Sequence, residues 1–264
     1  MCTVTLHRAQ GELLATMNRD ELRGRAPEHP PLYFGRMNPQ VRWVMPIDGE
    51  SGGTWMGANS EGVVACLLNA YQPGESSDRA SILAAGTVSR GKIVPEALFQ
   101  GPETAVEAWL HGVVDPSPFS PFSLVVAGPE QTVAWSWNGQ GQVLRTPLSG
   151  EWVMESSSSL DAARVLPYRE RLFETWIQEG ARFEFDLPSF HLQQVEGRAE
   201  WSPFMSRELS STRSITQARV EIARGILALR YWSNPEANSL APPPTSVFHL
   251  PLAHPHPAHM ERSA

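Results

Sequence analysis

Cysteine is scarce in this 264-residue sequence, which has Cys2 and Cys66 and no others. Two cysteines are too few for the disulfide framework of a small secreted domain. No apolar run approaches the roughly 18 consecutive residues that a membrane-spanning helix requires. Arg8 interrupts the segment where a signal peptide would carry its apolar core. We therefore expect a cytoplasmic protein without stable membrane insertion.

Positive charge is in short supply as well. Lys and Arg number 21 against 28 Asp and Glu, which leaves a net charge of −7 with histidine neutral. Such a chain has no surplus of cations to neutralise a phosphate backbone, so nucleic acid is excluded as a partner. The length allows a sizeable core, and the composition is that of a globular protein rather than a disordered one.

Alternating apolar and polar residues begin at the N-terminus and return several times along the chain. Cys2–His7 and Glu12–Met17 flank Gln10-Gly11, which predicts a hairpin. The same pattern predicts three further hairpins, namely Thr54–Gly57 with Val63–Leu68, Phe122–Ala127 with Thr132–Trp137, and Ile215–Ile222 with Ile226–Trp232. Shorter strands are expected at Gln142–Arg145, Trp152–Met154 and, as a closing edge strand, Val247–Leu250.

Helical patterning is confined to three segments: Asp78–Val88, Pro102–His111 and Leu160–Gly180. Pro167 predicts a kink in the last of them, and a serine of the Ser156–Ser159 run is expected to cap its start. The order of strands, helices, strands, helix and strands favours an antiparallel α+β fold over a series of βαβ units.

One domain is expected over residues 1–252, followed by a loose Pro/His-rich tail over residues 253–264. The tail carries His254, His256 and His259 without nearby cysteine or carboxylate ligands, which indicates adventitious metal binding at most. We expect no cofactor. Gly52-Gly53 is predicted to form a tight turn with positive φ, and Cys66 to be an inert core thiol.

Cys2 is the strongest candidate for a catalytic residue. A small side chain after the initiator methionine permits removal of Met1, which leaves a thiol and a free α-amine on one residue. The amine titrates near ~7.7–8.0 and the thiol near ~8.5, so a modest positive field can move the proton off the sulfur. A Cys2 processed in this way combines a nucleophile with its own base.

The residue that lies opposite Cys2 depends on the turn of the first hairpin. A two-residue turn places Arg19 opposite Cys2, and a three-residue loop places Asp20 there. Arg19 would lower the thiol pKa and Asp20 would hold the α-ammonium. Spacing alone favours a structural alternative, in which Cys2 is a small strand residue and the Asn18–Glu21 cluster a polar strand exit.

Several short motifs occur in a specific combination, and together they resemble the NRDE family, also called the Transport and Golgi organization 2 family. They are Met1-Cys2-Thr3, Asn18-Arg19-Asp20-Glu21, Ser51–Gly57, Gly62, Leu68-Asn69, Ser89-Arg90-Gly91 and Thr212-Arg213-Ser214. The resemblance extends over roughly residues 1–250. It implies a relative of the N-terminal nucleophile hydrolases with a four-layer αββα sandwich.

The resemblance also implies roles for particular residues. Cys2 matches the nucleophile, and Arg19 with Asp20 the charged pair that flanks it. Asn69 matches an oxyanion-hole donor and Arg213 a late active-site arginine. A second, mid-chain Asn donor is expected in this family, but the sequence there is Glu155 followed by four serines, so a hydroxyl must substitute or the oxyanion hole is incomplete.

Two functions follow as expectations. The first is a hydrolase or acyltransferase that acts on a linear amide or thioester through a Cys2 acyl-enzyme. The alternative is a non-catalytic binding or trafficking module for a lipid-like, acyl-coenzyme A or haem-like ligand. Either way, the expected partner is a small acyl or lipid-like molecule.

Overall fold

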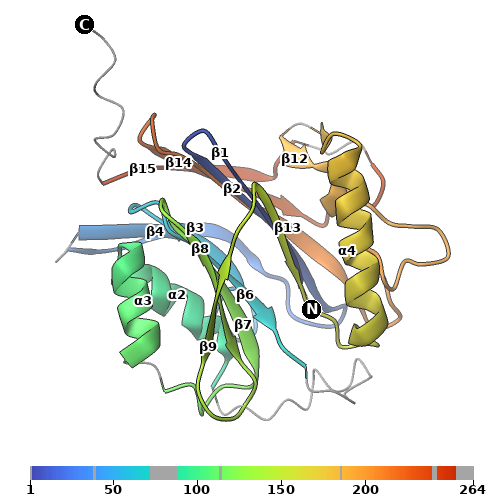
Figure 1. Cartoon of the computed structure of the whole chain (residues 1–264), viewed down its shortest axis with the longest axis horizontal. Helices are drawn as coiled ribbons and strands as arrows, with labels where there is room; N and C mark the ends of the chain where they lie inside the picture. Colours follow the sequence, from blue (N-terminus) through green and yellow to red (C-terminus); the bar gives the residue numbers. More distant parts are fainter. Residues whose placement is uncertain are drawn as a thin grey trace, which may run out of the picture.

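Two antiparallel sheets pack face to face, and helices cover both outer surfaces (Figure 1). The computed structural model describes residues 2–37, 40–71, 88–112, 115–184, 186–239 and 243–253. The layers are a pair of helices, a seven-stranded sheet, a six-stranded sheet and a long helix, in that order. The expected αββα sandwich is confirmed.

The six-stranded sheet contains the N-terminal strand next to one of its edge strands. Its order is β10 (Trp152–Ser156), β1 (Cys2–Ala9), β2 (Glu12–Leu22), β13 (Ser210–Glu221), β14 (Ile226–Ser233) and β15 (Ser246–Pro251). Helix α4 (Ala162–Gln178) packs on its outer face, beside η2 (Ser189–Leu192) and the short pair β11 (Phe183–Glu184) and β12 (Leu187–Pro188). Cys2, Val4 and Leu6 point inward between the sheets because successive side chains of a strand alternate.

The seven-stranded sheet forms the other half of the core. Its order is β3 (His29–Met37), β4 (Gln40–Ile47), β5 (Met56–Asn59), β6 (Val64–Asn69), β7 (Phe122–Ala127), β8 (Thr132–Trp137) and β9 (Leu144–Leu148). The turn η1 (Arg90–Lys92) leads into α2 (Ile93–Gln100) and α3 (Glu103–Gly112), which cover its outer face. Strand β6 is apolar from Val64 to Leu68 because Cys66 faces the other sheet while Ala65 and Leu67 face the helix layer.

The first hairpin has the shorter of the two turns that the sequence allows. Gln10 and Gly11 both have positive φ, 49° and 77°, which a two-residue turn of type I′ requires. The register therefore places Cys2 opposite Arg19. The third hairpin has the predicted bounds, and β15 is the predicted edge strand of its sheet.

Other expectations need correction. Strands β3 and β4 and helix α2 were not anticipated, and β9 begins at Leu144 rather than Gln142. Most of the helix expected at Asp78–Val88 lies outside the described residues, and Val88 itself forms a bridge with Phe119. Helix α4 runs through Pro167 as one element.

The serine run does not cap α4. The residue before the helix is Asp161, which has φ 39° and no side-chain capping hydrogen bond. Ser158 instead bonds to the backbone of Leu160, two residues along. Ser156 and Ser157 contact β1 instead, through Thr3 Oγ1 and the nitrogen of Cys2. No helix among the described residues is long and apolar enough to cross a membrane.

A buried histidine fastens η2 to the outer face of the six-stranded sheet. The Nδ1 atom of His191 donates to Asn18 Oδ1 at 2.8 Å, and Nε2 accepts from Thr5 Oγ1 at 2.7 Å. Asn18 Nδ2 donates in turn to the carbonyls of His191 and Pro203, both at 2.9 Å. Burial lowers the pKa of His191 to about 3.

This histidine gives a prediction for stability in acid. An unfolded chain protonates His191 near pH ~6.5, whereas the folded protein keeps it neutral down to about pH 3. Between these values the unfolded state binds the extra proton, so the free energy of unfolding falls as the pH falls, by about 1.4 kcal/mol per pH unit. Urea denaturation from pH 7 to pH 4 should show a smaller slope for His191→Gln than for the wild type. Equal slopes would assign the acid sensitivity to other groups.

Candidate active site

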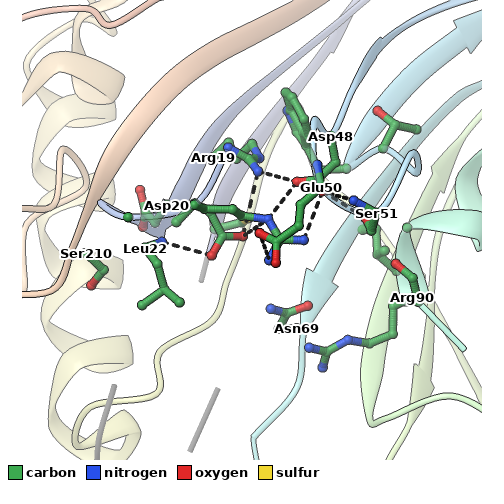
Figure 2. A pocket seen from close by; sticks show the side chains of 18 of the residues that line it. Arg19, Asp20, Leu22, Asp48, Glu50, Ser51, Asn69, Arg90 and Ser210 are labelled. Atoms are coloured by element: carbon green, nitrogen blue, oxygen red, sulfur yellow. Dashed lines mark hydrogen bonds and ion pairs between the residues drawn. The ribbon is translucent and has the colours of Figure 1, made fainter. Parts of the chain in front are cut away.

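A pocket of about 620 Å³ opens where the ends of β1, β2 and β6 approach one another. Cys2, Arg19 and Asp20 of the six-stranded sheet and Asn69 of the seven-stranded sheet all line it. The structure thus brings four of the five predicted site residues to one cavity. Figure 2 shows an ionic cluster around Asp48 on one side, with Asn69 and Arg90 lying together on another side.

Cys2 lines the pocket and is only 7% exposed. Burial raises the pKa of its thiol above the ordinary value, and the field of Asp20 acts in the same direction. Arg19 acts in the opposite direction, but its effect is smaller. Arg19 therefore lowers the thiol pKa, as expected, but burial outweighs this effect and the net pKa of Cys2 is raised.

The effect of Arg19 on the thiol pKa is small because its guanidinium has other charged partners. Its Nη1 donates to Glu28 Oε2 at 3.2 Å and its Nη2 to Asp48 Oδ2 at 2.5 Å. The guanidinium also lies 4.4 Å from the ring centroid of Trp55. Two carboxylates therefore offset the charge of Arg19, which weakens its effect on the pKa of the thiol.

Asp48 is the centre of that ionic cluster. Arg25 donates to both of its carboxylate oxygens at 2.9 Å, and the backbone and hydroxyl of Ser51 donate to Oδ1 at 2.8 and 2.9 Å. Burial alone would raise the pKa of Asp48, but these hydrogen bonds hold it well below its usual range. These hydrogen bonds and ion pairs form one wall of the pocket.

Asp20 follows Arg19 in the strand, so its side chain points to the opposite face of the sheet. It is 2% exposed and accepts a hydrogen bond from Thr212 Oγ1 at 2.7 Å. Burial raises its pKa, while the nearby cations Arg169 and Arg207 act against that rise. A carboxylate held in this way, beside the start of β1, can stabilise a positive charge there.

Arg169 and Arg207 are buried cations near Asp20 that the sequence analysis does not single out. Arg169 comes from α4, is fully buried, and donates through Nη1 to Thr3 Oγ1 and Ser156 Oγ at 3.0 and 2.9 Å. Burial lowers its pKa to about 10. Arg207 donates to Ser158 Oγ at 3.2 Å. A signal was present, because Arg169 occupies the face of α4 that also carries the buried residues Val165, Phe173 and Trp176.

Asn69 ends β6, on the side of the pocket away from the Asp48 cluster (Figure 2). Arg90 lies beside it and is anchored by a hydrogen bond from Nη1 to the carbonyl of Pro121 at 2.8 Å. The Gly52-Gly53 turn packs closely against Gly91, the residue that follows Arg90. Gly52 has the predicted positive φ, and a Cβ on Gly53 would lie 2.6 Å from the carbonyl carbon of Gly91.

Arg213 is not among the described residues that line the pocket. Its Nη1 donates to the carbonyls of Leu22 and Arg23 at 3.1 and 3.2 Å, and its Nη2 lies 4.0 Å from Glu28 Oε2. Since Glu28 also binds Arg19, Arg213 touches the site through one intermediate carboxylate. The described residues contain no group of three or more His, Cys, Asp or Glu that would hold a metal ion. His254, His256 and His259 lie outside the described residues.

Solved structures of an amidase, an acylase and a hydrolase are among those similar to this one. The Caenorhabditis elegans N-acylethanolamine-hydrolyzing acid amidase ortholog has a TM-score of 0.54 and 14% identity, with coverage of 82% of this chain and 92% of the amidase. Penicillin V acylase from Agrobacterium tumefaciens has a TM-score of 0.51 and 11% identity, with coverage of 96% and 86%. A variant of conjugated bile acid hydrolase from Clostridium perfringens has a TM-score of 0.55 and 11% identity, with coverage of 95% and 92%.

These likenesses define the fold as that of the N-terminal nucleophile hydrolases. At such low identities they establish the fold and nothing finer. The family model described as Transport and Golgi organisation 2 matches residues 1–234, and the chain belongs to that family. No curated protein sequence matches the chain.

Proposed function

We propose that this protein is an N-terminal-cysteine hydrolase or acyltransferase that acts on a linear amide or thioester of a small acyl substrate. The observation that carries the proposal is the position of Cys2. It begins β1, which lies between β10 and β2, and it lines a pocket of about 620 Å³ together with Asn69. This volume is within the range that small-molecule sites occupy. The solved structures with the same fold include an amidase, an acylase and a hydrolase by name.

The reaction would begin after removal of Met1, when the α-amine of Cys2 takes the thiol proton. The sulfur attacks the substrate carbonyl carbon, and the amide group of Asn69 donates to the developing oxyanion. The ammonium then returns its proton to the departing amine or thiol, which leaves a thioester on Cys2. Water or an acceptor amine attacks that thioester, with the α-amine again serving as base.

The charged residues support this sequence of steps. Asp20 stabilises the ammonium form of Cys2, because it is a buried carboxylate at the start of β1. Arg19 and the Asp48 cluster hold the pocket wall, and Arg213 positions Glu28 against Arg19. Since burial raises the thiol pKa, thiolate forms only as the proton passes to the amine.

The same burial favours a second candidate function. A thiol that is 7% exposed and less acidic than usual suits a non-catalytic module. Such a module would bind a lipid-like, acyl-coenzyme A or haem-like ligand in the same pocket. The absence of an Asn from the serine segment, which begins at Ser156, agrees with this alternative.

The mature N-terminus and its reaction with an acyl donor separate the two candidates. Intact-mass analysis of protein from the native producer should show loss of one methionine. Incubation with p-nitrophenyl acetate should then give a burst of p-nitrophenol and an acetyl group on the N-terminal peptide, with Cys66 unmodified. Retention of Met1 would contradict the hydrolase, since no α-amine would be present on Cys2. Removal of Met1 without acylation would favour the binding module.

A further inference from the structure

The hydrogen-bond ladder between β1 and β10 ends in an irregular way at the nucleophile. Thr3 is opposite Ser156, so the next opposed pair is Cys2 and Ser157. The amide of Ser157 donates to the carbonyl of Cys2 at 3.0 Å, as in a regular antiparallel pair. The reciprocal bond is different, because the nitrogen of Cys2 donates to Ser157 Oγ at 3.1 Å.

The carbonyl of Ser157 has another partner. It accepts from Arg169 Nη1 at 3.4 Å, and the same nitrogen binds Ser156 Oγ and Thr3 Oγ1. Arg169 is fully buried and Ser157 is 8% exposed, so this arrangement is held inside the protein. The result is that a hydroxyl, rather than a backbone carbonyl, meets the nitrogen on which the proposed mechanism depends.

A serine hydroxyl can accept a hydrogen bond from the Cys2 nitrogen, as a carbonyl can. A carbonyl only accepts, whereas a serine hydroxyl accepts and also donates through a proton that rotates freely. The proposed base alternates between an amine and an ammonium. Ser157 Oγ can accept an N–H from either form, which leaves the amine lone pair or the third ammonium proton directed toward the thiol and substrate.

We propose that Ser157 is the positioning residue for the α-amine of Cys2. Its Oγ accepts an N–H from that amine and fixes the direction of the lone pair that receives the thiol proton. This inference rests on the proposed function. It assigns the serine segment to the base, in place of the oxyanion donor that a hydroxyl here was expected to supply.

The test uses the fact that the chain has two cysteines. Protein whose mature N-terminus is Cys2 is labelled with [13Cβ]cysteine, which gives one signal for Cys2 and one for Cys66 as an internal reference. Titration of the Cys2 signal reports ionisation of its amine and thiol. The variants are Ser157→Ala, Ser157→Thr, and Ser159→Ala as a matched control, since Ser159 is a buried serine of the same segment whose Oγ contacts Arg207.

We expect Ser157→Ala to move the amine titration to lower pH, because the ammonium loses an acceptor. Acylation of Cys2 by p-nitrophenyl acetate should slow by about tenfold, the loss of one hydrogen bond, with the pH profile of the rate moved in the same sense. Ser157→Thr should restore both properties, and Ser159→Ala should match the wild type in both.

The two parts of the experiment can fail separately. An unchanged amine titration in Ser157→Ala overturns the assignment, even if Cys2 is acylated normally. A wild type that is never acylated, while Ser157→Ala still shifts the titration, contradicts the proposed reaction and supports the contact between Ser157 and the amine. Far-UV circular dichroism of each variant shows whether the fold is retained, and Ser157→Thr tests the assignment should the alanine variant misfold.

Discussion

Replacing Cys2 by serine should reduce acylation by p-nitrophenyl acetate by at least about 10³-fold. A hydroxyl is far less acidic than a thiol, so the α-amine cannot take up its proton to a useful extent. Burial also disfavours the ionised serine side chain, as it already disfavours the thiolate of Cys2. The burst of p-nitrophenol measures the effect, and an unchanged melting temperature shows that the fold is intact.

Cys66 provides the matched control. It lies in the same core cluster as Cys2 and is 1% exposed, and burial raises the pKa of its thiol strongly. Cys66→Ala should keep acylation close to that of the wild type and cost a modest amount of stability through the small cavity. A Cys2→Ser variant that is acylated as fast as the wild type would remove Cys2 from the proposed mechanism. A binding module would bind its ligand equally well with serine.

Truncating Arg169 to alanine should lower the free energy of unfolding by about 3–5 kcal/mol, because a fully buried side chain and its hydrogen bonds are lost. The change removes a cation whose charge offsets burial of Asp20. It also removes the donor for Thr3, Ser156 and Ser157. Urea denaturation at pH 7 measures the change.

Arg171 is the matched control for this second prediction, because it is an exposed arginine of the same helix. Arg171→Ala should stay within about 0.5 kcal/mol of the wild type. The double variant Arg169→Met with Asp20→Asn should be less destabilised than the sum of the single variants, since it removes both charges together. Strict additivity would indicate that Arg169 stabilises the protein independently of Asp20.

The first hairpin shows how far the sequence leads. Gln10-Gly11 limited the register to two possibilities, and the positive φ of both residues selected the one with Arg19 opposite Cys2. The hairpin pattern does not predict which carboxylates neutralise Arg19. Glu28 and Asp48, which neutralise Arg19, come from segments whose return to the pocket no local pattern encodes.

Arg213 shows a second limit. With a regular ladder between β2 and β13, the pairing of Thr212 with Asp20 would continue to Arg213 opposite Arg19. The register instead shifts between Thr212 and Ser214, and Ser214 is opposite Arg19. A bulge redirects the side chain of the extra residue, so the two arginines do not face each other. The residue types at positions 212–214 do not predict a bulge.

Strand β3 was overlooked because its sequence lacks the usual strand pattern. It contains Pro30 and Pro31, and the side chains of Leu32 and Tyr33 are more than half exposed at 52% and 54%. Proline is tolerated here because β3 is the edge strand of its sheet, where one side of the backbone has no partner strand. The apolar pattern of α4 likewise does not single out the cation Arg169, although it lies on the buried face of the helix.

The position of Cys2 between β2 and β10 also sets an order of events during synthesis. Strand β2 follows β1 after a turn of two residues, but β10 begins at Trp152. At about 5–20 residues per second, a ribosome needs roughly 8–30 s to deliver the strand that completes the surroundings of Cys2. An aminopeptidase that acts on the nascent chain has that interval in which to cleave the first peptide bond. Removal of Met1 would then have to occur before β10 is synthesised, rather than on the folded protein.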